Sequence, residues 1–460
     1  MDFSAANTEL WNTIIQAGMI AGILLIANVL RRKIGLVRKS LMPTSVLGGF
    51  LLLLIRVSRL VPVSIPFLEM VTYHGIALGF IALSLRTLSR KDPASMDGPK
   101  SGALIVSCYV IQGITGLVIT LALSYTLMPD LFKAAGVLLP MGYGQGPGQA
   151  NNIGTVYENL GFAGGRSFAL SIAAAGFLSA CVAGIIYLNI LNRGGMAPKN
   201  RTGEIAGSVT VDTFQDQGEI PVSESIDKLS IQAALVLLTY LAAYLVTRFL
   251  NFSAGFLGEG AAKMTGSLLW GFNFLVGAIL AVILRNIFGG LRRSGLMTRQ
   301  YTNNYLLSRI SGLAFDLMII CGIAAIEISD LRGLWLPFIL LSLAGAVVTL
   351  FYLRWICKKI YPAYYLEGLL SMYGMMTGTI SSGIILLREL DPDYRTPAAD
   401  NLVAGSAFAV PFGIPILALI GIAPKSPAMT FFVLAGLGIY MVFLLVFLVK
   451  RGKPESSVIP

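Results

Sequence analysis

Long apolar runs, separated by short polar or basic loops, extend over almost the whole chain. A membrane-spanning helix requires roughly 17–25 mostly apolar residues, and eleven runs meet or approach that length. These runs cover 10–30, 41–57, 67–88, 102–128, 164–191, 230–250, 264–288, 306–328, 334–357, 402–422 and 429–449, of which the second is short. The pattern predicts an all-α polytopic membrane protein with about 11 transmembrane helices.

Two further stretches, 131–162 and 363–390, are apolar at their edges but are interrupted by glycine and polar residues. The first contains five glycines and a proline within the 13 residues 142–154. Glycine leaves backbone amides accessible and proline breaks a helix, so such a segment cannot form a lipid-facing helix. We interpret both stretches as re-entrant hairpins. For the first, an extramembrane glycine-rich loop is the alternative.

Basic residues are distributed unequally over the predicted loops. Suppose that each hairpin enters and leaves by one face and that the N-terminus is outside. The cytoplasmic side then carries 24 Lys and Arg residues and the opposite side carries 8, of which Arg166 and Arg248 lie at helix ends. Short cytoplasmic loops of membrane proteins are enriched in Lys and Arg. We therefore expect a multi-pass protein of a bacterial inner membrane, with the N-terminus outside and the C-terminus in the cytoplasm.

The second half of the chain repeats features of the first. The same residue types recur at an offset of 230 residues in three pairs: Tyr143 and Tyr373, Gly144 and Gly374, Gly148 and Gly378. At the same offset, the apolar run 102–128 falls on 332–358. With five spans on each side of a polar segment, the two halves face opposite ways. Inverted repeats with interrupted helices are typical of secondary transporters.

The polar segment 192–229 contains six acidic residues and divides the chain nearly in half. It is interpreted as a cytoplasmic linker. The predicted organisation is an N-terminal inverted repeat (1–191), this linker, a C-terminal inverted repeat (230–422), and an extra terminal helix with a tail (423–460).

Composition excludes several classes of protein. Hydrophobic residues make up 55% of the chain and charged residues only 12%, against about 45–50% and 25% in soluble domains. An ordinary soluble enzyme, a disordered chain and a disulfide-stapled domain are therefore excluded. The net charge of +11 is explained by the loops and does not indicate nucleic-acid binding. With a single histidine, His74, most metal and Ser-His-Asp chemistry is hard to build, and we expect no enzymatic activity.

The first hairpin supplies backbone amides and neutral side-chain amides. Helix N-termini beside such a break can bind a carboxylate, and amide and carbonyl oxygens suit Na⁺. The predicted substrate-binding residues are Gly144, Gln145, Gly146, Gly148, Gln149 and Asn151, with Asn152 as a Na⁺ ligand. Gln112 and Asn273, within the apolar runs 102–128 and 264–288, are expected to form hydrogen bonds between helices.

The second hairpin carries hydroxyl groups in place of amides. Thr377, Gly378, Thr379 and Arg388 are predicted to bind substrate, and Ser381 and Ser382 are predicted Na⁺ ligands. Close helix packing explains part of this pattern without a ligand. For Arg388, the alternative is an interfacial pair with Glu389 or Asp391.

Two charged residues outside the hairpins are also candidates. Asp316 lies near the middle of an apolar run, where a carboxylate is a functional candidate by default. It is predicted to be a Na⁺ ligand, with a proton carrier or a structural partner of an arginine as alternatives. Arg166 opens the span after the first hairpin and is either a substrate ligand or an interface anchor.

The hairpins resemble those of the sodium/glutamate symporters. The stretch from Gly144 to Ala150 (GQGPGQA) is similar to that family's G-H-G-T-G-A-A, with Gln145 at the histidine position and Pro147 at the threonine position. The second hairpin has Thr-Gly-Thr where better-known members have Thr-Pro-Thr, followed by the stretch 386–392. The chain therefore resembles a divergent branch. The resemblance implies Na⁺-coupled glutamate uptake by an elevator-like movement in a homodimer.

Together, these observations predict a secondary transporter that moves a glutamate-like or related small carboxylate or amino acid with Na⁺ across a lipid bilayer. Na⁺ is the expected coupling ion because the hairpins are rich in hydroxyls and amides; no organic cofactor is expected. A H⁺-coupled carrier of another organic anion and an uncoupled facilitator or channel remain the alternatives.

Overall fold

The computed structural model describes most of the 460-residue chain and is built from helices. The described residues are 3–4, 7–35, 37, 41–59, 61–86, 97–193, 228–256, 266, 269–271, 273–391 and 396–450. Over these ranges every regular element is an α- or 3₁₀-helix. The prediction of an all-α protein is confirmed.

The described helices fall into two series, one in each half of the chain. The first series comprises α1 (Thr8–Lys33), α3 (Thr44–Val57), α4 (Ile65–Leu85), α5 (Asp97–Thr126), η1 (Lys133–Val137), α6 (Leu138–Tyr143), α7 (Pro147–Asn159) and α8 (Gly165–Arg193). The second comprises α9 (Lys228–Gly255), α11 (Asn273–Arg293), α12 (Asn304–Ala324), η3 (Ile328–Leu331), α13 (Trp335–Ile360), η4 (Pro362–Tyr364), α14 (Tyr365–Thr377), α15 (Ile380–Arg388), α16 (Ala398–Ile422), η5 (Ala423–Lys425) and α17 (Pro427–Lys450). The predicted linker falls almost wholly outside the described residues.

Ten of the described helices are long and apolar enough to cross a membrane, one fewer than predicted. The difference is α3, which is apolar but only 14 residues long. At 1.5 Å per residue such a helix measures about 21 Å, whereas the hydrocarbon core of a bilayer is about 30 Å thick. The protein is therefore a multi-pass membrane protein with one short apolar helix.

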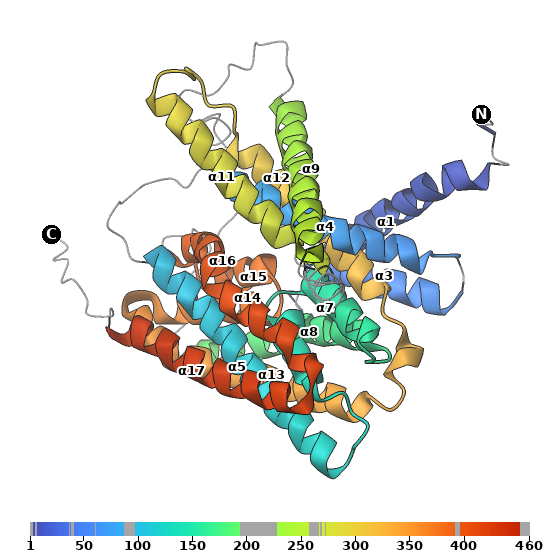
Figure 1. Ribbon diagram of the computed structural model, residues 1–460, viewed down its shortest axis with the longest axis vertical. Helices are drawn as coiled ribbons and strands as arrows, with labels where there is room; N and C mark the ends of the chain where they lie inside the picture. Colours follow the sequence, from blue (N-terminus) through green and yellow to red (C-terminus); the bar gives the residue numbers. More distant parts are fainter. Residues whose placement is uncertain are drawn as a thin grey trace.

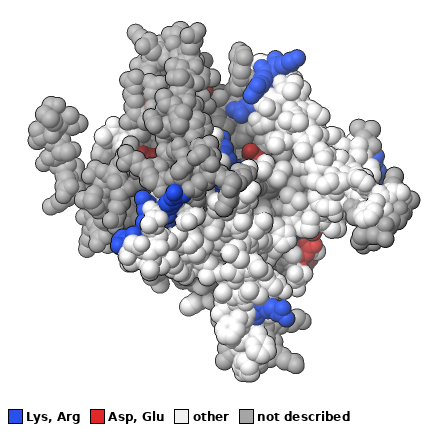
Figure 2. Space-filling view, turned by 90° about the horizontal axis from the view of Figure 1, so that it is seen from above, with Lys and Arg blue, Asp and Glu red and all other residues white. Residues whose placement is uncertain are grey.

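The surface is consistent with a lipid environment. Large apolar side chains are exposed on several of the long helices, among them Leu238, Phe249, Phe432 and Ile439. Figure 2 shows a face on which most described side chains are uncharged and Lys, Arg, Asp and Glu form a few small groups. Monomeric soluble proteins rarely expose apolar surface on this scale.

The helices pack into two bundles (Figure 1). We call α1, α3, α4, α9, α11 and α12 the peripheral bundle, and α5–α8 with α13–α17 the hairpin bundle. Glycines allow close helix contacts in both. A Cβ added to Gly79 would come within 2.3 Å of the Phe315 ring, which joins α4 to α12. In the hairpin bundle, a Cβ on Gly102 of α5 would lie 2.7 Å from the Phe408 backbone of α16.

Both broken stretches fold as helical hairpins. In the first, the rings of Phe132 and Phe162 stack with centroids 5.0 Å apart, so the two ends of the stretch lie together. In the second, α14 and α15 pack closely against one another: a Cβ added to Gly374 would lie 2.8 Å from Cα of Gly383. The two arms of each stretch therefore lie together.

The two hairpins approach from opposite ends of α5. The Thr120 hydroxyl, near the C-terminus of α5, donates a 2.9 Å hydrogen bond to the Lys133 carbonyl at the base of the first hairpin. Ser101, near the N-terminus of α5, lies 2.6 Å from the Tyr361 hydroxyl at the base of the second. Residues 101 and 120 are about 28 Å apart along a helix, close to the thickness of a hydrocarbon core.

Candidate functional site

A cavity of about 130 Å³ lies between the two bundles, at the tips of both hairpins. The peripheral bundle contributes Ile76, Phe80, Leu83, Phe274, Leu275, Phe315 and Met318. The hairpin bundle contributes Tyr109, Gly144, Gln145, Met375, Gly378, Thr379, Ile380, Ser406, Ala409, Val410, Gly413 and Leu417. Four of the residues predicted to bind substrate therefore line one cavity: Gly144, Gln145, Gly378 and Thr379.

The break in the first hairpin is shorter than its composition predicts. Helix α6 ends at Tyr143 and α7 begins at Pro147, so only three residues separate the two helices. Gly146 has φ +80°, a backbone conformation that glycine adopts without strain. A Cβ on Gly144 would come within 2.4 Å of the Tyr109 ring, so the aromatic ring of α5 lies directly against this backbone.

The helix that follows this break is buried, which excludes an exposed loop. Gln149 has no exposed surface, and Asn151 and Asn152 are about 5% and 4% exposed. Gly148 permits the burial, because a Cβ there would lie 2.6 Å from Ile76 of α4. The first turn of α7 is thus pressed against the peripheral bundle.

The amide side chains of α7 are not satisfied by the protein. Both the oxygen and the nitrogen of the Gln149 amide are buried without a hydrogen-bond partner, as are the side-chain oxygens of Asn151 and Asn152. Only the nitrogen of Asn152 has a partner here, donating a 3.0 Å bond to the Gly271 carbonyl. A buried polar group without a partner destabilises a fold by roughly 1–3 kcal/mol. Such a group is available to a ligand, an ion or a water molecule.

The break in the second hairpin is confined to Gly378 and Thr379, between α14 and α15. Thr379 occupies the N-cap position of α15, but its hydroxyl makes no capping bond and is buried without a partner. The hydroxyl of Ser382 is likewise unpartnered and lies under the break, 2.8 Å from the place of a Gly378 Cβ. By contrast, the Thr377 hydroxyl donates a 2.8 Å bond to the Tyr373 carbonyl in its own helix.

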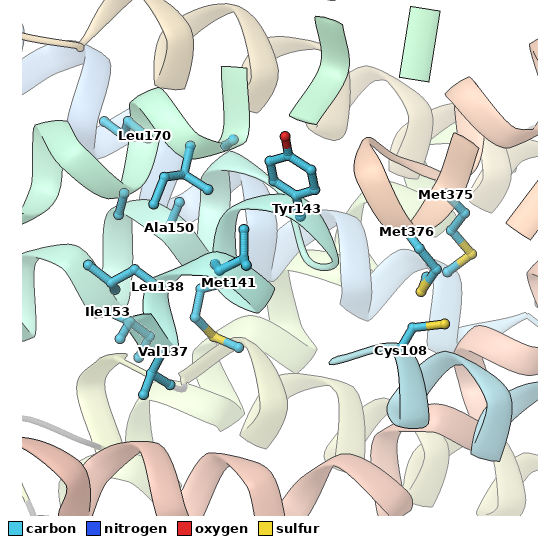
Figure 3. Close-up of a cluster of buried hydrophobic side chains, with 14 of the residues drawn as sticks. Cys108, Val137, Leu138, Met141, Tyr143, Ala150, Ile153, Leu170, Met375 and Met376 are labelled. Atoms are coloured by element: carbon cyan, nitrogen blue, oxygen red, sulfur yellow. The ribbon is translucent and has the colours of Figure 1, made fainter. Parts of the chain in front are cut away.

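Gln112 of α5 anchors the second tip. Its amide nitrogen donates 2.9 Å bonds to the Met376 carbonyl and to the Thr349 hydroxyl of α13. The expected helix-to-helix hydrogen bond is therefore present, and it also holds the last turn of α14. In Figure 3, Met375 and Met376 lie on one side of Tyr143, and the apolar side chains of the first hairpin lie on the other.

Two helix N-termini meet beside the cavity. Helix α7 starts at Pro147 and α15 starts at Ile380, and neither has a side-chain cap. A Cβ on Gly146 would lie 3.7 Å from the Gly378 carbonyl, so the two breaks touch. Free backbone amides and helix dipoles favour an anion at such a place. The unpartnered oxygens of Gln149, Asn152 and their neighbours are of the type that binds Na⁺.

Arg166 lies away from the cavity, in a charged network that joins the bundles. Its guanidinium pairs with Glu69 of α4 and lies 3.0 Å from Glu327, which follows α12. Its backbone amide also donates a 3.0 Å bond to the Glu158 carboxylate. These contacts argue against Arg166 as a substrate ligand, and its role as a membrane-interface anchor stays a prediction.

Asp316 is not among the cavity residues. On α12, Phe315 and Met318 line the cavity, whereas Asp316 is within hydrogen-bonding reach of Ser45 on α3. Its role as a Na⁺ ligand stays a prediction without support from this arrangement.

The side chains of Ser381 and Arg388 lie outside the described part of the structure. The backbone places Arg388 at the last position of α15, whose first residue, Ile380, lines the cavity. Arg388 follows Ile380 by eight positions, a distance of about 12 Å along a helix.

The cavity also contains residues that the sequence analysis did not single out. Ser406, Ala409, Val410, Gly413 and Leu417 form one face of α16. Counted from Ser406, the other four lie three, four, seven and eleven positions further along, which is the spacing of one helical face. This spacing identifies the residues only once α16 is known to line the cavity. Comparison with family models, with curated proteins and with solved structures finds no match for the chain.

Proposed function

We propose that the protein is a secondary active transporter that couples the movement of a small carboxylate or amino acid to Na⁺. The supporting observation is the meeting of two helical hairpins, from opposite ends of α5, beside a cavity between two bundles. Secondary transporters commonly bind substrate and coupling ions where interrupted helices meet near the membrane midplane.

The proposed mechanism is alternating access. Because one wall of the cavity belongs to the peripheral bundle and the other to the hairpin bundle, movement of one bundle against the other would change which side the cavity faces. An elevator-like movement of the hairpin bundle, inverted repeats, a homodimer and membership of the sodium/glutamate symporters belong to this proposal. They rest on the resemblance of the hairpin motifs and on the arrangement of the hairpins.

Na⁺ is the proposed coupling ion because the unpartnered groups in the two hairpins are neutral oxygens, with the Gln149 amide nitrogen as the exception. Those of Gln149, Asn151, Asn152 and Ser382 are buried within two short helices. Amide and hydroxyl oxygens are ordinary ligands of a hard cation such as Na⁺ and are not titrated near neutral pH. This set of ligands supports Na⁺ coupling over H⁺ coupling.

The proposed location is a bacterial inner membrane, with the N-terminus outside and the C-terminus in the cytoplasm. The unequal distribution of Lys and Arg over the loops supports this orientation. The last turns of α11 and α13 carry Arg292, Arg293, Lys358 and Lys359, which this orientation places at the cytoplasmic face.

The test is uptake of radiolabelled solutes into proteoliposomes that contain the full chain. Leucine and glutamate are each supplied with an inward Na⁺ gradient, with an equal K⁺ gradient, or with an inward H⁺ gradient. The proposal predicts accumulation above the external concentration in Na⁺ only. Accumulation driven by H⁺ alone would establish a H⁺-coupled carrier. Equilibration without accumulation under every gradient would establish a facilitator.

A further inference from the structure

The walls of the cavity between the bundles are almost entirely apolar. Along the peripheral bundle they consist of aliphatic, aromatic and methionine side chains. Phe80 lies at the centre of this wall, with ring centroids 5.3 Å from Phe274 and 5.5 Å from Phe315. Contacts between three rings on three different helices make this a fixed surface.

Polar groups that are available to a ligand are concentrated at one place in the cavity. Thr379 has an unpartnered hydroxyl, and Gln145 lies at the other break. Ser406 also lines the cavity, but its hydroxyl donates a 2.7 Å bond to the Leu402 carbonyl. The polar end of a bound solute therefore belongs at the hairpin tips.

None of the described residues that line the cavity is charged. Arg166 is engaged by carboxylates elsewhere, and the backbone of Arg388 is at the far end of α15. Among the described residues of the walls, the second carboxylate of a dicarboxylate such as glutamate would find no cation. Burying an unpaired charge is strongly unfavourable, whereas burying an apolar group in the same space is favourable.

The cavity has room for a small solute. Its volume of about 130 Å³ is close to that of an engineered apolar cavity of about 150 Å³ that binds benzene, which corresponds to an apolar body of about six non-hydrogen atoms. An amino acid with a branched aliphatic side chain, or the corresponding carboxylic acid, has an apolar body that fits this size.

Resting on the proposed transport function, we propose that the solute has one carboxylate on an apolar body. The carboxylate binds at the N-termini of α7 and α15, beside Gln145 and Thr379. The apolar body contacts the Phe80 wall and the lining face of α16. This assignment replaces glutamate, expected from the family resemblance, with a solute of different chemistry.

Gly413 offers a direct way to test occupancy of the cavity. It lines the cavity, and a Cβ added there would meet nothing within 4 Å. Gly413→Leu therefore adds a bulky side chain at the cavity wall, and its Cβ meets no described atom within 4 Å. Gly438 of α17 is a matched control, because it too has open space around its Cβ position and does not line the cavity.

The experiment compares four solutes of similar size in two matched pairs. Leucine and glutamate share an amino group and differ in an isobutyl or a carboxyethyl side chain; 4-methylpentanoate and glutarate are the corresponding acids without the amino group. Binding is measured as a shift in the thermal unfolding midpoint of the purified protein in Na⁺, and uptake of leucine and glutamate is measured in proteoliposomes. The two pairs also distinguish an amino acid from a simple carboxylate.

The proposal predicts at least about tenfold tighter binding of each apolar member than of its dicarboxylate partner. Gly413→Leu should abolish this binding, and Gly438→Leu should not. Tighter binding of glutamate or glutarate would overturn the assignment while leaving Na⁺-coupled transport intact. Leucine uptake that ignores the Na⁺ gradient but is lost in Gly413→Leu would support the assignment and reject Na⁺ coupling. Absence of binding by all four solutes in folded protein would overturn it.

Discussion

Gly146 and Thr379 lie against one another although they belong to opposite halves of the chain. A Cβ added to Gly146 would be 3.8 Å from Cγ2 of Thr379, an ordinary van der Waals contact. The two helix breaks therefore form a single place, with free helix N-termini on both sides.

Gln149 provides the clearest test of the ion site. Its amide is buried without a partner, so Gln149→Leu should leave the free energy of unfolding unchanged, or raise it by up to about 3 kcal/mol. If the amide oxygen binds Na⁺, the same variant loses the increase in the unfolding midpoint that Na⁺ gives to the unmodified protein. Thermal unfolding in Na⁺ and in K⁺ measures both effects.

Gln232 is the control for this substitution. It is buried to a similar extent, but its side-chain amide donates a 2.7 Å hydrogen bond to the Tyr301 carbonyl. The same amide accepts a 3.1 Å hydrogen bond from the backbone N–H of Asn303. Gln232→Leu should lower the free energy of unfolding by about 1–3 kcal/mol and retain the Na⁺ effect. If Gln149→Leu retains the Na⁺ effect as well, Gln149 is not an ion ligand.

Thr379 and Thr377 should respond differently to the same isosteric change. The Thr379 hydroxyl is unpartnered beside the cavity, whereas the Thr377 hydroxyl is bonded within its own helix. A hydrogen bond to a charged group contributes about 1.5–3 kcal/mol, so Thr379→Val should weaken carboxylate binding by roughly tenfold or more. Thr377→Val should leave binding within about twofold. Equal losses in the two variants, measured by titration of leucine, would contradict this assignment.

The positive φ of Gly146 predicts that any side chain at this position destabilises the first break. Replacing it with alanine forces a side chain into a backbone region (φ +80°, ψ −172°) that only glycine adopts readily, which destabilises a protein by about 1–3 kcal/mol. Gly161, with φ +102° in the loop after α7 and open space around its Cβ position, provides the control. Both alanine variants should lower the unfolding midpoint, and only Gly146→Ala should reduce transport. Equal transport by the two variants would argue against a role for the first break.

Arg166 should couple the two bundles energetically. Arg166→Gln leaves Glu69 and Glu327 without their partner, and a double-mutant cycle with Glu69→Gln should give a coupling free energy of about 0.5–3 kcal/mol. The exposed Arg332 is a control whose replacement by Gln should change stability by less than about 0.5 kcal/mol. Strict additivity of the Arg166 and Glu69 substitutions in chemical unfolding would show that the pair contributes nothing.

The outline of the fold could be predicted from the sequence because apolar runs and their interruptions are determined by local composition. The interruption at Gly144 and the one at Gly378 identified both hairpins, and the structure brings Gln145 and Thr379 into one cavity. The lengths of the breaks could not be predicted in this way. Glycine and proline suit a helix start as well as a loop, so most of the segment after Gly146 is helical.

The walls of the cavity could not be predicted from composition. Phe80 and Val410 line it, yet they resemble the many apolar residues that face lipid or pack between helices. Only the packing of α4 and α16 distinguishes them. The same limit applies to Asp316, because a carboxylate in an apolar run is only a functional candidate. The rotation of α12 about its axis decides which of its side chains face the cavity. In this structure Phe315 and Met318 face it.

The central claim, that the hairpin tips bind Na⁺ and solute together, is tested most directly by solute-driven entry of radiolabelled Na⁺ into proteoliposomes. Leucine and glutamate gradients are applied in turn, with no initial Na⁺ gradient, to the unmodified protein and to Gln149→Leu. The account predicts that at least one of the two solutes drives Na⁺ inward through the unmodified protein and not through the variant. Entry of Na⁺ at the same rate with and without either solute, in protein that transports the solute, would contradict it.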